Sequence, residues 1–241
     1  MSKLPKAPLL EIIFEINWDI TNKNDIVKFQ YLHGDLFSNL KDKYPYRENL
    51  LPPEVPLDIA KGMPVYRFRK EKLGYPLTQI GPGILTYNTI DELYFWNDFK
   101  TEVKHLTNSF SEVFSEINNT NLFLTLTYID FFEIDFNKQN VIDFINENLS
   151  LNVNQSIINN KNTNAINLTL SYQIEDNILS LNLRNGVVSN NKQGIILQTK
   201  LIGKKQTYTN KEQAKWLNEA HETCSSIFKK ITTDKLYSSF K

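Results

Sequence analysis

The sequence predicts an α+β fold in which two long helices pack on a mostly antiparallel β-sheet. Three observations support this class. Short stretches of alternating apolar and polar residues, typical of half-exposed strands, recur along the chain. Two long stretches, residues 93–118 and 210–233, instead carry apolar residues at intervals of three and four, which is the period of an amphipathic helix. The order strand, helix, strands, long helix occurs twice, which indicates an internal duplication.

The composition is that of a folded protein. Of the 241 residues, 41% are hydrophobic and 22% are charged, so a sizeable core is available and global disorder is excluded. We expect two α+β halves, residues 1–120 and 121–241, that form one compact domain. Lys and Arg number 27 and Asp and Glu number 27, which disfavours a wide nucleic-acid surface.

The N-terminal stretch contains no signal-peptide core, because Glu11 and Glu15 interrupt its apolar residues. No uninterrupted apolar run approaches the roughly 18 residues that a membrane-spanning helix needs. The single cysteine, Cys224, excludes an intramolecular disulfide and a multi-cysteine zinc site, and it suits a reducing compartment. The sequence therefore predicts a cytoplasmic protein that does not associate with membranes.

The first half begins with a strand and a helix. In residues 11–19, EIIFEINWD, apolar and polar residues alternate as they do in a strand with one solvated face. Residues 25–43 have the helical period, and the predicted helix ends before Pro45. Five prolines between residues 45 and 64 indicate an extended surface connection.

Two strands and a long helix complete the first half. The strands are predicted at residues 65–71, VYRFRKE, and 75–88, YPLTQIGPGILTYN. Thr89 and Glu92 have the spacing of a capping box, and we expect them to open the helix over residues 93–118.

The second half repeats this order. Its first strand, residues 121–135, is apolar on both faces, which predicts a central position in the sheet. A second capping box, Thr209 and Glu212, is expected to open the helix over residues 210–233. The elements between them are a helix at 141–149, a polar loop at 150–165, and alternating strands at 166–174, 179–183 and 195–202.

A Gly-Pro-Gly sequence, Gly81 to Gly83, is the most distinctive local pattern. A phosphate-binding or dinucleotide-binding loop would continue into a helix, whereas a predicted strand follows here. We interpret the sequence as a bulge or bend inside one long, extended strand. The alternative is that glycine allows a ligand or partner to approach the backbone.

Several titratable residues could carry chemistry. Glu11 and Glu15 share one strand face, where two carboxylates could act as acid and base or bind a hard metal. We prefer the interpretation that they are solvated or serve as caps, since Asp and Glu are usually exposed. His221 and Cys224 are three residues apart on the last helix, but Cys224 lies on the apolar stripe, which predicts a packed, unreactive thiol. A pairing of Glu15 with His221 across the fold is the catalytic alternative that stays open. We assign no catalytic residue, no metal site and no cofactor.

Two arginines lie on one predicted strand. Arg67 and Arg69 share a strand face, and Tyr66 and Phe68 share the other. Arginines in this arrangement could stack on bases or bind phosphates. Zero net charge favours a solvated sheet face instead, so nucleic-acid binding stays open without being the preferred interpretation.

Three motifs together resemble a sporadically distributed, poorly characterised family of prokaryotic proteins. These motifs are an N-terminal P-x-x-E-x-x-F-E, a central I-G-P-G-x-L-x-x-N and an A-H pair in the C-terminal helix. The matching residues are Pro8, Glu11, Phe14, Glu15, Gly81, Pro82, Leu85, Asn88, Ala220, His221 and Phe228. The resemblance spans nearly the whole chain and implies a one-chain architecture. The scattered distribution of the family implies a defence or toxin-antitoxin context.

We therefore expect a non-enzymatic binding or interaction protein that works with a protein partner, as an accessory or regulatory component of bacterial defence or a toxin-antitoxin system. Two alternatives stay open: a small-molecule sensor or enzyme with a cleft between the two halves, and a nucleic-acid binder that uses Arg67 and Arg69. Homo-oligomerisation also stays open. The expected ligand or partner surface comprises Glu11, Glu15, Arg67, Arg69, Gln79, Gly81, Asn88 and His221.

Overall fold

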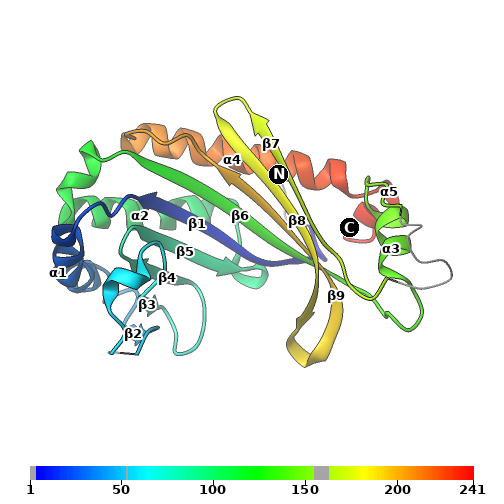
Figure 1. Ribbon diagram of the computed structural model, residues 1–241, viewed down its shortest axis with the longest axis horizontal. Helices are drawn as coiled ribbons and strands as arrows, with labels where there is room; N and C mark the ends of the chain where they lie inside the picture. Colours follow the sequence, from blue (N-terminus) through cyan, green and yellow to red (C-terminus); the bar gives the residue numbers. More distant parts are fainter. Residues whose placement is uncertain (1–3, 53, 155–162) are drawn as a thin grey trace. The chain divides into compact units, whose positions relative to one another are not determined.

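The structure, a computed structural model, describes residues 4–52, 54–154 and 163–241 (Figure 1). The described residues form an antiparallel sheet with helices, so the predicted α+β class is confirmed. Within these residues, no helix has the length and apolar character that a membrane crossing requires. The predicted polar loop at 150–165 lies partly outside the described residues.

The strands are β1 (Leu9–Trp18), β2 (Tyr46–Asn49), β3 (Tyr66–Arg69), β4 (Leu77–Gly81), β5 (Ile84–Ile90), β6 (Leu122–Glu133), β7 (Asn167–Ile174), β8 (Asn177–Val188) and β9 (Lys192–Ile202). The α-helices are α1 (Lys23–Leu40), α2 (Trp96–Val113), α3 (Val141–Asn148), α4 (Asn210–Ile231) and α5 (Asp234–Ser238). Short 3-10 helices are η1 (Leu57–Ala60), η2 (Asp91–Leu93), η3 (Ser115–Asn119) and η4 (Ser189–Asn191).

The strand order in the sheet is β2-β3-β4-β5-β1-β6-β9-β8-β7. In the first half of the chain, the first strand, β1, lies next to the last strand, β5, and β4, β3 and β2 follow outward. In the second half, β6 lies next to β9, and β8 and β7 follow outward. Both halves thus use the same order of elements and the same rule of strand placement, which supports the predicted duplication.

The contacts divide the chain into two compact units. The unit that we call the α2 unit comprises Glu11–Leu126 and Ile202–Glu219. The other, the β7 unit, comprises the residues up to Leu10 together with Thr127–Leu201 and Ala220–Lys241. The predicted halves follow the sequence repeat and not these units, and that division stays a prediction.

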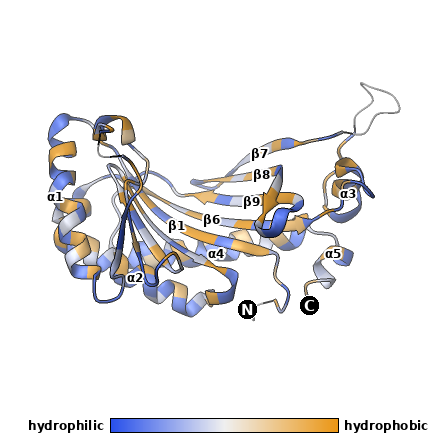
Figure 2. Cartoon of the chain, turned by 90° about the horizontal axis from the view of Figure 1, so that it is seen from below, coloured by the Kyte–Doolittle hydropathy of each residue, from blue (hydrophilic) through white to orange (hydrophobic). Residues whose placement is uncertain are grey.

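The core of the α2 unit lies between its strands and helices α1 and α2. The buried face of β1 comprises Ile12, Phe14, Ile16 and Trp18. On β5, the Tyr87 ring centre lies 5.2 Å from that of Phe99 in α2, and on β3 the Phe68 ring lies 5.1 Å from Phe37 in α1. Apolar and polar residues are interleaved along both helices (Figure 2), which is the pattern that lets each helix bury one side.

The Gly-Pro-Gly sequence forms a tight turn, so the predicted bend inside one strand is wrong. Gly81 of β4 pairs with Ile84 of β5, which leaves Pro82 and Gly83 as a two-residue turn between two antiparallel strands. Gly83 has a φ of 87°, and a type II turn places Pro and a positive-φ Gly at these two positions. A Cβ atom on Gly81 would lie 1.8 Å from the carbonyl oxygen of Met63. The chain's own backbone therefore makes this close approach.

The proline-rich connection is more structured than predicted. It contains the edge strand β2, which pairs with β3, and the short helix η1. Glu48 of β2 meets both arginines of β3: its carboxylate lies 2.8 Å from Arg69 Nε and 3.5 Å from Arg67 Nη1. A cross-strand ion pair of this kind stabilises a short edge strand that has few apolar contacts.

Helix α2 is shorter than the predicted 93–118. Thr89 belongs to β5 and Glu92 to η2, so the predicted capping box does not open the helix. The helix begins at Trp96, without a side-chain hydrogen bond at its N-cap. It ends at Val113 because Phe114, with a φ of −132° and a ψ of 70°, leaves the helical conformation.

The second predicted capping box is confirmed. The Thr209 backbone N–H donates to Glu212 Oε2 at 2.7 Å, and the Glu212 N–H donates to Thr209 Oγ1 at 3.2 Å. Helix α4 ends at Ile231, after which Thr233 caps α5. Ile227, which lies three residues after the buried Cys224 on this helix, is only half-buried.

A candidate functional site: the lysine groove

The predicted surface residues, apart from His221, lie on one face of the sheet in the α2 unit. The register aligns Glu15, Gln79 and Arg67 in one row across β1, β5, β4 and β3. Since successive residues of a strand point to opposite faces, the remaining predicted residues share this side. We call it the polar face, and its predicted residues are Glu11, Glu15, Arg67, Arg69, Gln79, Gly81 and Asn88.

A hydrogen-bond network occupies one part of the polar face. The buried Thr86 donates to Asn88 Oδ1 at 2.6 Å, and Asn88 Nδ2 donates to Glu11 Oε1 at 2.8 Å. Tyr75 also donates to Glu11 Oε1, at 3.3 Å. Burial, and then the nearby Glu11 charge, raise the pKa of Tyr75, which keeps its hydroxyl a donor. The Glu11 carboxylate is therefore engaged within the fold.

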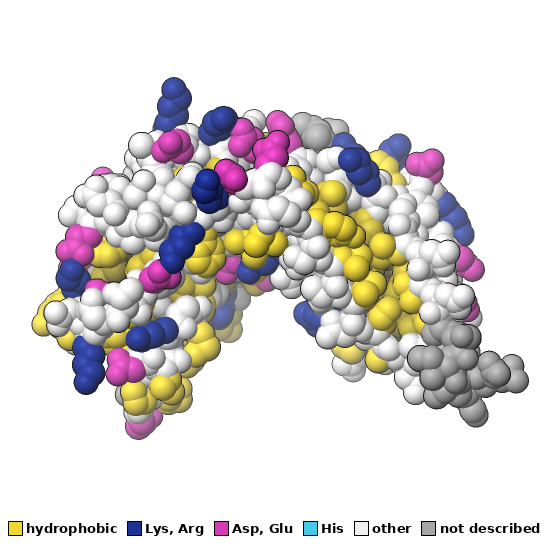
Figure 3. Space-filling model, turned by 45° about the horizontal axis from the view of Figure 1, so that its top comes forward, with side chains coloured by type: hydrophobic (Ala, Val, Ile, Leu, Met, Phe, Trp, Pro, Cys, Tyr) yellow, Lys and Arg dark blue, Asp and Glu magenta, His cyan; other side chains and the backbone are white. Residues whose placement is uncertain are grey.

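The two arginines of the polar face also have partners within the fold. Arg69 donates from Nε to Glu48 Oε1 at 2.8 Å and from Nη1 to the Gly74 carbonyl at 2.7 Å. Arg67 Nη1 lies 3.5 Å from Glu48 Oε2. Sequence reasoning missed Glu48, because its strand β2 was not predicted. On the face drawn in Figure 3, Lys and Arg are interspersed with Asp and Glu. The two hydrogen bonds of Arg69 favour a structural role for that residue. Arg67 is only partly engaged, because its Nε is buried and has no hydrogen-bond partner among the described residues.

His221 and Cys224 lie in the β7 unit. The Nδ1 atom of His221 is 2.7 Å from the Tyr128 hydroxyl oxygen. Burial raises the pKa of Cys224 to about 12, and the charge of Asp130 adds to this effect. The thiol therefore stays protonated near neutral pH, which disfavours a nucleophilic role. Glu15 belongs to the α2 unit, and its predicted pairing with His221 stays a prediction.

A groove with a volume of about 630 Å³ lies between α2 and the first turns of α4 in the α2 unit. Its apolar floor is formed by Phe14, Val103 and Leu217, all of which are buried. Sites for small organic ligands commonly have volumes of this size and an apolar floor with a few polar groups. We call this site the lysine groove, because its charged lining residues are Lys100, Lys104 and Lys211.

The charge of the lysine groove is positive and uncompensated. No Asp or Glu among the described residues lines it, and Lys100, Lys104 and Lys211 form no ion pair with any described residue. Lys100 Nζ instead lies 5.6 Å from the centre of the Trp96 ring. The first turn of α4 contributes the positive end of its helix dipole. Together these charges create a local potential that attracts anions.

Uncharged polar side chains complete the lining. Asn97, Thr101, Asn210, Gln213 and Asn218 bring amide and hydroxyl groups to the groove. Gln213 Oε1 is buried and has no hydrogen-bond partner among the described residues. An acceptor in this state is stabilised when a bound molecule supplies a donor.

The local sequence explains how the groove is assembled. The helical period turns Val103 toward the core and leaves Lys100 and Lys104, four residues apart, on the same side of α2. The Thr209 capping box starts α4 so that Lys211 lies in its first turn. Sequence reasoning missed this site because nothing in the local pattern shows that the start of α4 lies beside α2.

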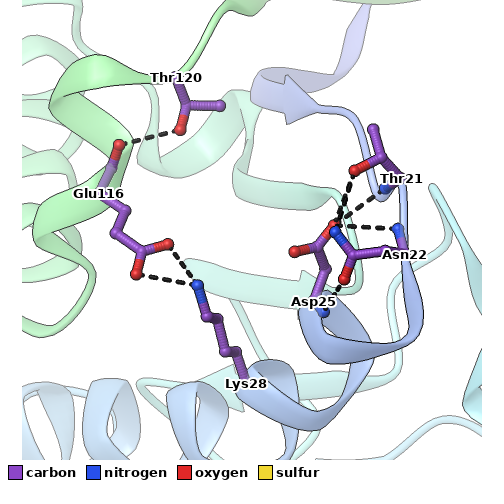
Figure 4. Close-up of polar contacts among 6 residues, drawn as sticks. All are labelled: Thr21, Asn22, Asp25, Lys28, Glu116 and Thr120. Carbon is purple, nitrogen blue, oxygen red and sulfur yellow. Dashed lines mark hydrogen bonds and ion pairs between the residues drawn. The ribbon is translucent and has the colours of Figure 1, made fainter.

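A second cavity in the α2 unit, of about 330 Å³, has polar groups that already satisfy one another (Figure 4). Asp25 Oδ2 accepts from the backbone N–H groups of Thr21 at 2.9 Å and Asn22 at 3.2 Å. Lys28 donates to Glu116 Oε2 at 2.7 Å. Because these charges are compensated within the fold, this cavity is a weaker candidate for a charged ligand than the lysine groove.

No protein-family model, no curated protein and no solved structure matches the chain. The resemblance to the prokaryotic family therefore stays a prediction from its motifs. Across residues 4–52, 54–154 and 163–241, no group of three or more His, Cys, Asp or Glu side chains could hold a metal ion. Among the described residues, the lysine groove is consequently the best-supported candidate for a functional site, because of its volume and its charge.

Proposed function

We propose that the protein is a non-enzymatic binding protein whose lysine groove holds a small organic anion. The ligand has an anionic head, such as a phosphate or carboxylate, and an apolar or aromatic body. One observation carries the proposal: three lysines without an ion-pair partner surround a buried apolar floor. Lysines that only keep a protein soluble would not need to lie around an apolar floor. A pocket for a neutral apolar ligand would not need three lysines at its lining.

The groove accommodates the two parts of this ligand in different places. The head group lies among Lys100, Lys104 and Lys211, and the body covers Phe14 and Leu217. For partly solvated charges at contact distance, each lysine contributes on the order of 1 kcal/mol. Three lysines therefore strengthen binding by about 3 kcal/mol, or about a hundredfold.

Anilinonaphthalene sulfonate is a suitable probe, because it joins a sulfonate to an aromatic body. We expect saturable binding to the native protein, measured by dye fluorescence, and weaker binding as salt screens the lysines. The double variant Lys104→Glu/Lys211→Glu should bind the dye at least about tenfold more weakly, because each reversal replaces an attraction with a repulsion.

The matched control is Lys61→Glu/Lys72→Glu, which changes the net charge equally at two exposed lysines of the same unit outside the groove. This control should bind the dye like the natural protein. Circular dichroism establishes that each variant is folded. Equal dye affinity in all three proteins would refute the proposed site, and so would equal weakening in both double variants.

Only the motif resemblance indicates a biological context for this protein. We propose that the protein acts in the cytoplasm as an accessory or regulatory component with a protein partner, in bacterial defence or a toxin-antitoxin system. If the groove binds an anionic small molecule, that ligand would regulate the interaction of this protein with its partner. Because Arg67 and Arg69 bind Glu48, the nucleic-acid alternative has less support.

A further inference from the structure

Among the described residues, the strand β7 is an edge of the sheet that no further strand covers. It is the last strand in the sheet order, and its eight residues, NLTLSYQI, include no charged residue and no proline. Its register with β8 is continuous, without a bulge. The strand at the other end of the order, β2, has only four residues, of which Arg47 and Glu48 are charged. Proteins usually protect exposed edges by shortness, charge, proline or bulges, and β7 uses none of these.

The backbone of β7 offers a regular row of free hydrogen-bonding groups. The Asn185 N–H donates to the Ile166 carbonyl at 3.3 Å, which fixes the phase of hydrogen bonding with β8. Bonded and non-bonded pairs alternate in an antiparallel ladder. The groups that point away from β8 are therefore the N–H and C=O of Asn167, Thr169, Ser171 and Gln173. In the described part of the chain, no strand follows β7 on that side.

The side chains along this edge alternate in character. Leu168, Leu170 and Tyr172 lie on one face, opposite Leu183, Leu181 and Leu179 of β8. The three β8 leucines are buried, but no residue of β7 is, and Tyr172 is 47% exposed. The other face of β7 carries Asn167, Thr169, Ser171 and Gln173. Another strand added here would extend both the apolar face and the ladder.

We propose that a second copy of this chain pairs with β7 in antiparallel fashion, about a twofold axis at Leu170. In this register Leu170 faces Leu170 of the partner subunit, and Leu168 faces Tyr172 of the partner subunit. Thr169 exchanges hydrogen bonds with Ser171 of the partner subunit. The strand is self-complementary, because apolar residues meet apolar residues and no charge meets a like charge across the axis. This interface is separate from the lysine groove, so either proposal can fail alone.

A cysteine at position 170 tests the register. Residues that face each other in a non-hydrogen-bonded antiparallel pair have Cα atoms about 4.5 Å apart, within the range of a disulfide. Leu170→Cys should therefore form a disulfide-linked dimer under mild oxidation, seen on a non-reducing gel. Leu168→Cys is the matched control, since it is a half-buried leucine of the same face. Its two copies would lie roughly 13 Å apart along the strands and should not link.

A proline at Ser171 tests the same interface without cysteine chemistry. The Ser171 N–H points away from β8, so Ser171→Pro leaves the β7–β8 ladder intact and removes a donor to the partner. Sedimentation equilibrium should show a dimer for the natural protein and a monomer for Ser171→Pro, with unchanged circular dichroism. A natural protein that sediments as a monomer would overturn the proposal. So would equal linking of the two cysteine variants, or a Ser171→Pro variant that remains a dimer.

Discussion

Replacing Gly81 by alanine tests how tightly the β4–β5 turn packs against the chain before β3. The new Cβ atom would lie 1.8 Å from the Met63 carbonyl oxygen, whereas ordinary contacts begin at 3.4 Å, so the two backbones must separate by 1.6 Å. This movement strains two backbone hydrogen bonds, Gly62 N–H to the Pro82 carbonyl at 2.7 Å and Val65 N–H to the Ile80 carbonyl at 2.9 Å. At about 1 kcal/mol for each bond and a similar amount for backbone strain, Gly81→Ala should cost about 3 kcal/mol.

Gly34→Ala is the matched control, because Gly34 lies inside helix α1 and an added Cβ would meet no atom within 4 Å. Helix propensity predicts a gain of about 1 kcal/mol there. For a chain of this size each kcal/mol shifts the melting temperature by about 2–4 °C. Differential scanning calorimetry should show Gly81→Ala melting about 6–12 °C lower and Gly34→Ala about 2–4 °C higher. A Gly81→Ala protein that melts like the natural one would refute the close packing at this turn.

Phe110→Ala should lower the free energy of unfolding by about 3–5 kcal/mol, because Phe110 is buried. Ile227→Ala should lower it clearly less, because Ile227 is only half-buried. Equal urea midpoints for the two variants would contradict this ranking. Cys224 should react slowly with a thiol reagent at pH 8 and rapidly after unfolding, because burial raises the pKa of the thiol to about 12. Rapid labelling of Cys224 in the native protein would exclude a packed thiol. Burial and the charge of Arg47 lower the pKa of His33 from 6.5 to about 4, so the unfolded chain takes up the proton first as pH falls. The free energy of unfolding should therefore decrease from pH 6.5 toward pH 4. In urea titrations, His33→Gln should show a smaller decrease than the natural protein. An identical pH dependence in the two proteins would rule out a contribution of His33.

The sequence predicted those elements whose signals are local. The alternation in β1 and the stripes of α1 and α4 depend on residues within one element, and these elements formed where expected. The predicted capping box of Thr209 and Glu212 formed, because neither residue pairs in a strand. Thr89 has the same spacing to Glu92, but it pairs in β5 with β1, and tertiary pairing overrides a local cap. The Gly-Pro-Gly sequence was recognised as backbone architecture, yet a turn and a bulge have similar sequence signals.

The candidate site was harder to predict because it depends on contacts between distant segments. The polar residues of β1, β3, β4 and β5 could be assigned to strand faces by alternation, and the structure gathers them on the polar face. Alternation could not show that Glu48 would bind Arg67 and Arg69, since β2 was not predicted. The lysine groove unites residues about one hundred positions apart, and no periodicity within α2 or α4 encodes that approach.

Chemical mapping of lysines with pyridoxal phosphate tests the central claim most directly. This probe carries a phosphate and an aromatic ring, and its aldehyde forms a Schiff base with a lysine beside which it binds. After borohydride reduction, peptide mass spectrometry identifies the modified lysines. At low reagent concentration Lys100, Lys104 and Lys211 should be modified before the exposed Lys61 and Lys72, and anilinonaphthalene sulfonate should protect them. Uniform modification of all five lysines, unaffected by the dye, would contradict an anion site in the groove.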